Sequence, residues 1–295
     1  MPYADITRRR FNQTAGSGYN CAIGECFFME MKCDMRTNYH AHTARCHHAE
    51  GTPEQYVRAA IEGGFDILGF SDHCPWEFGD GFVSGIRMLP EELAGYVAEV
   101  RELGEKYADS IKLYCGLECE YYPDLLDWMR GTVAEYGIDY LILGNHFDTD
   151  ERRDIYFGSA HTAARLHDYA DRTTRGMQTG MFRYLAHPDL CFRAYPEFDA
   201  DCEAVSRELC RCAKALDMPL EYNLLGVRYN KMGRNKGIGY PNARFWEIAA
   251  QEGVRCIIGV DAHQPERLTE SDAYDEAARY LESLGLERVV KLDFN

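Results

Sequence analysis

Short apolar runs alternate with longer amphipathic stretches along this chain from about residue 35 onward. Apolar runs of roughly four to eight residues, bounded by turn signals, are typical of buried strands in a parallel sheet. Seven such strands are expected, at Met35–Ala41, Asp66–Ser71, Ile111–Leu117, Tyr140–Gly144, Arg183–Ala186, Pro219–Tyr222 and Arg255–Val260.

Between these runs, apolar residues recur with the period of an α-helix. The first helix has a clear start signal, with Thr52 as N-cap, Pro53 at the first helical position and Gln55 completing a capping box. Helices are expected near Pro53–Glu62, Pro90–Tyr107, Pro123–Glu135, Ser159–Gly180, Asp201–Leu216 and Asn242–Glu252, with a further one at about Glu270–Leu284.

Alternating strands and helices predict an α/β fold with a parallel sheet. No internal repeat or low-complexity linker divides the chain, so we expect one domain over residues 35–295 after a polar extension over residues 1–34. The stretch Thr7–Phe11 resembles a twin-arginine export signal, but polar residues follow it where an apolar segment is required, and we discount export. A closed barrel and an open doubly wound sheet both fit the alternation.

Composition and charge narrow the range of partners. The formal net charge of -16 argues against a nucleic-acid backbone as the main partner, because phosphates repel an acidic surface. No apolar run is long enough to span a bilayer, so no membrane partner is expected. The 12 cysteines include no CxxC pair, which favours free thiols in a reducing cytoplasm. Nothing in the sequence indicates an oligomeric state.

Histidines and carboxylates gather where the expected strands end. The first strand ends in His40 and His42, and residues two apart in a strand point the same way, so both can share one ion. Active sites of β/α barrels are built at the carboxyl ends of the strands, so this placement favours the barrel. The remaining candidates are His47 or His48, then His73, Glu118, His146, His187, Asp261 and His263.

Mixed imidazole and carboxylate ligands suit Zn, Mn or Fe. Seven histidines and two carboxylates are too many for one ion, and Glu118 can bridge two ions with its two oxygens, so two or three ions are expected. Clustered ions lower the pKa of bound water and neutralise phosphate oxygens. His161 and His167 fall on an expected helix, where we interpret them as surface or packing residues.

A basic loop is expected after the sixth strand of this acidic protein. Arg228 offers two parallel donors that suit a phosphate, and Arg234 and Lys236 are further candidates for substrate contact. The alternative is a solvated loop with scattered charge. No GxxxxGK[ST] loop appears, so nucleotide-driven transfer is not indicated.

In order, these motifs resemble the PHP (polymerase and histidinol phosphatase) superfamily. They read HxH, a later His, (S/T)(D/E)H, GxE, GxHF, AHPD and DAH, and they run from about Asn38 to His263. Whole phrases are most similar to the monofunctional histidinol-phosphate phosphatases. These phrases are Gly69–His73 followed by Pro75, Gly116–Glu118 followed by Tyr121–Pro123, and Asp261–His263 followed by Pro265.

The resemblance implies a distorted (β/α)7 barrel with three metal ions at the carboxyl ends of its strands. It implies hydrolysis of L-histidinol phosphate to L-histidinol and phosphate, by attack of a hydroxide that bridges two ions, with Glu118, Asp261 and Arg228 as catalytic residues. The implied ligands are His40, His42, Glu118 and Asp261 for the first ion, Glu118, His146 and His187 for the second, and His48, His73 and His263 for the third.

Some features leave alternatives open. Asp72 stands where the family often has Glu, and Tyr229–Tyr240 is unusually basic and glycine-rich, so another small phosphate ester is a rival substrate. A metal-dependent amidohydrolase is a second rival. Such enzymes typically use a lysine to bridge their ions, whereas the bridging residue expected here is Glu118. An inactive PHP domain that serves a polymerase would lack ligands, whereas all nine positions are filled here. Asp72 and Asp189 are candidates for the acid that protonates the leaving alcohol.

Overall fold

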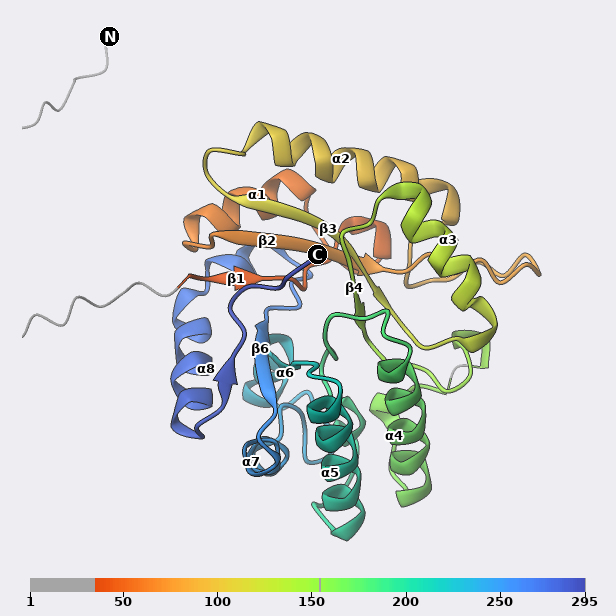
Figure 1. The fold of residues 1–295 in the computed structure, drawn as a ribbon, viewed down its shortest axis with the longest axis vertical. Helices are drawn as coiled ribbons and strands as arrows, with labels where there is room; N and C mark the ends of the chain where they lie inside the picture. The colour runs from red at the N-terminus through yellow and green to blue at the C-terminus, as the bar shows by residue number, and fades with distance from the viewer. Residues whose placement is uncertain (1–34, 154, 295) are drawn as a thin grey trace, which may run out of the picture. The chain divides into compact units, whose positions relative to one another are not determined.

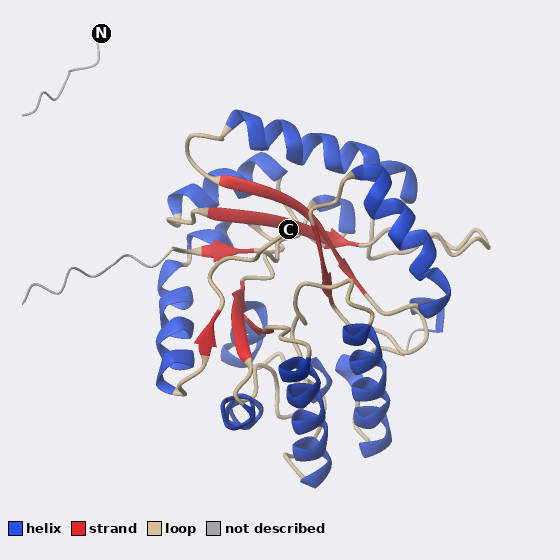
Figure 2. Ribbon diagram, in the orientation of Figure 1, coloured by secondary structure: helices blue, strands red, loops and turns tan. Residues whose placement is uncertain are grey.

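The computed structural model describes residues 35–153 and 155–294, so the polar extension predicted for residues 1–34 lies outside the described residues. Strands lie at the centre and helices surround them (Figure 2). The strands are β1 (Thr37–Asn38), β2 (Ile67–His73), β3 (Lys112–Cys119), β4 (Tyr140–Leu143), β5 (Leu220–Asn223), β6 (Arg255–Gly259) and β7 (Glu287–Arg288) (Figure 1).

The helices follow the predicted ones closely, and the first begins with the predicted capping box at Thr52 and Gln55. They are α1 (Pro53–Glu62), α2 (Leu93–Lys106), α3 (Leu126–Tyr136), α4 (Ala163–Gln178), α5 (Ala200–Ala215), α6 (Leu224–Lys231), α7 (Ala243–Glu252) and α8 (Ser271–Ser283). Helix α6 was not predicted, because its segment was expected to be a basic loop. Asn223 caps this helix by accepting a hydrogen bond from the backbone N–H of Gly226.

Every strand pair is parallel, in the orders β1-β2-β3-β4 and β5-β6-β7. Single bridges join the two sheets, from Leu143 through Leu185 to Leu220 on one side and from Ala41 to Ala262 on the other. Backbone pairing therefore runs around the whole ring, and the fold is the expected distorted β/α barrel.

The prediction of a regular strand at Arg183–Ala186 is wrong. Only Leu185 forms bridges there, although it still links β4 to β5 on both sides. The next residue after this segment, His187, has a left-handed backbone with φ 29°, which ends the extended conformation. The strand β7, which pairs with the start of β6, was not expected.

Aromatic side chains fill the floor of the barrel, at the amino ends of its strands. Tyr140 lies against Gly69 and Gly116, where an added Cβ would come within 2.2 Å and 2.5 Å of its atoms. The C-terminal segment crosses this end (Figure 1), and Phe294 packs 4.4 Å from Tyr114 between ring centres. These contacts close the floor, so only the opposite end is open for chemistry.

Two further observations bear on the sequence predictions. None of the described helices is long and apolar enough to cross a membrane. The described cysteines are free thiols, and all of them are buried except Cys212, which is half-buried.

Candidate metal centre

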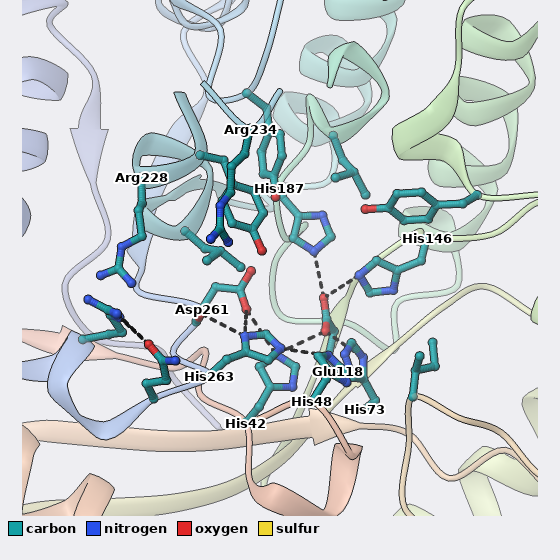
Figure 3. A pocket seen from close by; sticks show the side chains of 18 of the residues that line it. His42, His48, His73, Glu118, His146, His187, Arg228, Arg234, Asp261 and His263 are labelled. Carbon is teal, nitrogen blue, oxygen red and sulfur yellow. Dashed lines mark hydrogen bonds and ion pairs between the residues drawn. The ribbon is translucent and has the colours of Figure 1, made fainter. Parts of the chain in front are cut away.

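The predicted ligand residues meet at one mouth of the barrel, where the carboxyl ends of the strands converge (Figure 3). Different strands, or the segments that follow them, supply these residues, so side chains far apart in the sequence become neighbours. The residues brought together are His40, His42, His48, His73, Glu118, His146, His187, Asp261 and His263.

Glu118, at the end of β3, lies at the centre of this cluster (Figure 3). Its Oε1 is 2.9 Å from His187 Nε2, 3.4 Å from His146 Nε2 and 3.5 Å from His40 Nε2. Its Oε2 is 3.1 Å from His73 Nδ1 and 3.6 Å from His42 Nε2. The two carboxylate oxygens therefore face different histidines, which is the arrangement that a carboxylate bridging two ions requires.

Gly144, the first residue of the GxHF motif at residues 144–147, leaves the space that the Glu118 carboxylate occupies. A Cβ added at Gly144 would lie 2.1 Å from Glu118 Oε1, far inside van der Waals contact. Gly259 makes room in the same way for Glu221, with its added Cβ 1.8 Å from Oε1 of that residue. Both glycines are thus needed for close approach of a carboxylate to the neighbouring backbone.

Asp261 approaches the cluster from the end of β6. Its Oδ1 is 3.2 Å from His42 Nε2, 3.3 Å from His263 Nδ1 and 3.6 Å from His40 Nε2. Asp261 has a left-handed backbone with φ 51°, as does His187 with φ 29°. Backbone conformations of this kind cost energy in non-glycine residues and are concentrated at functional sites, where they direct a side chain.

His48, rather than its neighbour His47, turns toward the cluster. His48 lines the cavity in front of the cluster, and its Nε2 is 3.0 Å from His263 Nε2. His48, His73 and His263 offer ligand atoms that all lie within 4.8 Å of one another, as do His40, His42 and Asp261. The first group is the whole ligand set that the family resemblance implies for the third ion, and the second group is three of the four ligands implied for the first ion.

Several buried polar atoms of the cluster have no hydrogen-bond partner. They include Nε2 of His40, both ring nitrogens of His42, Nδ1 of His73 and Oδ1 of Asp261. Burial of unpaired polar atoms is costly, and native proteins usually pair them. Divalent cations are partners that imidazole nitrogens and carboxylates accept together, so these residues fit a metal site.

The electrostatics of the mouth favour added positive charge. Burial alone would raise the pKa of Glu118, but His146 and His40 hold it well below its ordinary value. Burial would lower the pKa of His42, yet the carboxylates of Asp261 and Asp72 raise it to about 9. The carboxylates therefore remain ionised and stabilise any cation placed between them.

Two carboxylates outside the predicted ligand set orient ligand histidines. Glu221 Oε1 accepts a hydrogen bond from His40 Nδ1 at 2.7 Å, and Glu120 Oε1 accepts one from His146 Nδ1 at 2.9 Å. Each histidine then presents Nε2 toward Glu118, the tautomer that a metal ligand needs. Neither carboxylate was singled out from the sequence, because a contact such as that between His40 and Glu221 joins residues 181 positions apart and has no local sequence signal.

A cavity of about 840 Å³ opens in front of the cluster. Three arginines, Arg228, Arg234 and Arg267, line it, and Arg267 was not predicted. Glu270 accepts hydrogen bonds from two of these arginines. Arg228 Nη2 lies 2.7 Å from both of its carboxylate oxygens, and Arg267 Nη1 lies 2.6 Å from Oε1. The lining also includes aromatic and apolar residues, among them Ile86, Phe147, Tyr156 and Leu190.

Three other predicted residues lie outside this cavity lining. Lys236 is exposed and does not line the cavity, so its substrate contact stays a prediction. Asp72 is buried behind His42 and accepts a hydrogen bond from the backbone of Thr43 at 3.1 Å. Asp189 is buried and accepts one from the backbone of Asn242 at 2.6 Å. Which residue protonates the leaving alcohol is therefore not decided by these contacts, and the roles of Asp72 and Asp189 stay predictions.

Comparison with known proteins gives consistent results. Residues 38–224 match the PHP domain family. The histidinol-phosphatase of Bacillus subtilis is 30% identical over 251 residues, which cover 76% of this chain and 92% of that protein. The "Probable histidinol-phosphatase" of Deinococcus radiodurans is 28% identical over 237 residues, which cover 77% of this chain and 85% of that protein.

A solved structure shares the fold. The histidinol phosphate phosphatase of Lactococcus lactis, in complex with zinc, L-histidinol and phosphate, superposes with a TM-score of 0.66 at 19% identity, covering 88% of this chain and 98% of that chain. The family match spans more than half of the 295 residues, and the alignment with the Bacillus subtilis protein covers 92% of that protein's length. This chain therefore belongs to the PHP domain family, in its histidinol-phosphatase branch.

Proposed function

We propose that this protein is a metal-dependent phosphomonoesterase that hydrolyses L-histidinol phosphate to L-histidinol and phosphate. The observation that carries the proposal is the buried cluster around Glu118, whose unpaired nitrogens and oxygens face a cavity lined by arginines. The names of the curated relatives support the choice of substrate. A reducing cytoplasm is the proposed location, supported by the free thiols among the described cysteines.

Two or three divalent ions, Zn, Mn or Fe, are the proposed cofactors. His40, His42, Glu118 and Asp261 would hold the first, Glu118, His146 and His187 the second, and His48, His73 and His263 the third. When bound, such ions activate water as a nucleophile at neutral pH and neutralise phosphate oxygens. Glu221 and Glu120 keep His40 and His146 in the ligand tautomer.

The arginines are the proposed phosphate contacts. Arg228, on α6, can offer a fork of donors to a phosphate, and Arg234 faces the same cavity (Figure 3). Glu270 holds the Arg228 guanidinium in place through two 2.7 Å contacts before any substrate arrives. Arg267 shares Glu270 with Arg228, so it is a further candidate for contact with the anion.

The test is phosphate release by the metal-reconstituted protein from L-histidinol phosphate, beside a panel of small phosphate esters, with metal content determined in parallel. The proposal expects histidinol phosphate to lead the panel by a wide margin with two or three ions bound per chain. If the ions are bound but another ester is hydrolysed fastest, that ester would replace L-histidinol phosphate as the proposed substrate. Full metal loading without turnover of any ester would contradict it.

A second phosphate ester is the alternative that the cavity itself favours. Arginines recognise a phosphate whatever alcohol it carries, and apolar lining residues such as Ile86, Phe147 and Tyr156 are not specific to one leaving group. The amidohydrolase alternative has less support, because no described lysine lines the cavity in front of Glu118.

A further inference from the structure

Arg87 is a buried arginine outside the ligand set, with only 1% of its surface exposed. Its Nε donates to Glu151 Oε2 at 2.7 Å, and its Nη2 donates to the same oxygen. Its Nη1 donates to the carbonyl of Cys74 at 2.9 Å and to Glu120 Oε2 at 3.2 Å, while Nη2 reaches Glu120 Oε1 at 3.1 Å. All five N–H groups of the guanidinium thus have an acceptor.

Glu120 connects this arginine to the candidate metal centre. It is fully buried and accepts hydrogen bonds from Trp76 Nε1 at 2.8 Å and from His146 Nδ1 at 2.9 Å, besides those from Arg87. A carboxylate held by this many donors has one orientation. His146 is therefore fixed with its Nε2 3.4 Å from Glu118 Oε1.

Arg87 also joins two walls of the substrate cavity. Arg87 directly follows Ile86, which lines the cavity. Glu151 lies five residues before Tyr156, which lines the same cavity. A second contact joins these segments, since Arg152 Nη1 is 2.6 Å from Asp80 Oδ2. Both segments are thus tied to one guanidinium, and through Glu120 to His146.

We infer that Arg87 is a positioning residue, which together with Glu120 and Glu151 fixes the His146 ring and holds two cavity walls against that ligand. The role in turnover rests on the proposed function, whereas the effect on metal retention does not. A lysine at this position keeps the charge but has three donors on one nitrogen, so it cannot reach both carboxylates as the planar fork does.

The test is Arg87→Lys. Loss of a contact behind a metal ligand typically costs about 10–100-fold in metal affinity or activity. We expect the variant to lose one ion to a chelator about 10–100-fold more readily than the wild type. We also expect kcat to fall by a similar factor with a smaller change in KM, and added metal to restore part of kcat.

The control is Arg207→Lys. Arg207 is a partly buried arginine on α5 that also contacts two carboxylates, Glu203 one turn earlier on the same helix and Glu252 at the end of α7, away from the cavity. This variant should lose some thermal stability while it keeps its metal content and kcat. Rescue by added metal in Arg87→Lys, but not in Arg207→Lys, separates positioning from a general loss of stability.

Glu151→Gln provides a second variant that leaves the contacts between Arg87 and Glu120 in place. It should show a smaller loss of metal retention and kcat in the same direction, and it decides the question if Arg87→Lys does not fold. Wild-type metal retention and kcat in the folded variants, with only a lower melting temperature, would overturn the inference. If the wild type hydrolyses no phosphate ester, the proposed function fails, but the chelator experiment still tests Arg87.

Discussion

The two ends of the barrel are built from neighbouring residues but differ in the hydrogen bonding of their buried polar atoms. At the floor, the Tyr140 hydroxyl donates to the carbonyls of Tyr39 and Phe70, and the Tyr39 hydroxyl accepts from the backbone of Leu292. At the mouth, the next residue along the chain, His40, has a buried Nε2 without a hydrogen-bond partner.

This difference separates what holds the fold from what performs the chemistry. The floor gains from packing and satisfied hydrogen bonds, so it needs nothing beyond the chain itself. The mouth concentrates ionised carboxylates and unpaired nitrogens, an arrangement that becomes favourable only with cations. Changes at the mouth should therefore alter activity and metal binding, whereas changes at the floor should alter stability.

Removal of the ions should give the largest effect. Dialysis against a chelator should abolish phosphate release and lower the melting temperature, because ligands that bind only the folded state stabilise it by about 4 kcal/mol at a thousandfold excess over Kd. Circular dichroism should show that the barrel remains folded at low temperature. Chelated protein with undiminished turnover would contradict the metal-dependent mechanism.

Asp261→Asn should come next. Asparagine tolerates the left-handed backbone at this position, with φ 51°, so the change removes charge without backbone strain. Loss of one stabilising contact in an active site typically costs about 10²–10³-fold in kcat, and we expect at least this much because Asp261 contacts three histidines. Steady-state kinetics and a melting curve test it; wild-type turnover would refute the ligand assignment.

Gly144→Ala should reduce activity by a smaller factor, about 10–100-fold, because the new Cβ would meet Glu118 Oε1 at 2.1 Å and displace the carboxylate that we propose bridges two ions. Gly131→Ala in helix α3 is the matched control, since nothing lies within 4 Å of its added Cβ. The control should be neutral in activity and more stable by up to about 1 kcal/mol. Equal kinetics in the two variants would mean that Glu118 tolerates displacement.

The sequence predicted the mouth better than the contacts behind it. A metal site needs particular residue types at strand ends, so His40, His42 and Asp261 stood out by type and spacing. The role of Glu221 depends on which side chains meet across the closed ring. That meeting follows from the three-dimensional packing of β1 near β5 and β6, which spacing along the chain does not contain.

Secondary structure shows the same limit. Strong amphipathic patterns predicted α1 to its exact ends, Pro53–Glu62, because its capping box is a local signal. Helix α6 was missed because Gly226 and its basic residues are typical of a loop, although Asn223 supplied an N-cap signal. The segment Arg183–Ala186 pairs on both sides yet stays too short to form a strand, since His187 turns the backbone away.

Tyr140→Phe should give the smallest effect and the sharpest test of the contrast between floor and mouth. The ring would still fill the space beside Gly69 and Gly116, but the carbonyls of Tyr39 and Phe70 would lose their hydroxyl donor, which costs about 1–3 kcal/mol when such groups are buried. Chemical denaturation should show this loss, while kcat and metal content stay at wild-type values.

Tyr114→Phe is the control for this variant, because Tyr114 belongs to the same aromatic cluster but its hydroxyl makes no hydrogen bond within the described residues. It should leave the free energy of unfolding nearly unchanged. If Tyr140→Phe instead weakened metal binding as much as it weakened the fold, the two ends of the barrel would be energetically coupled. The ligand geometry would then depend on the aromatic floor, and the hydrogen bonds from Tyr140 would have to be counted among the supports of the metal centre.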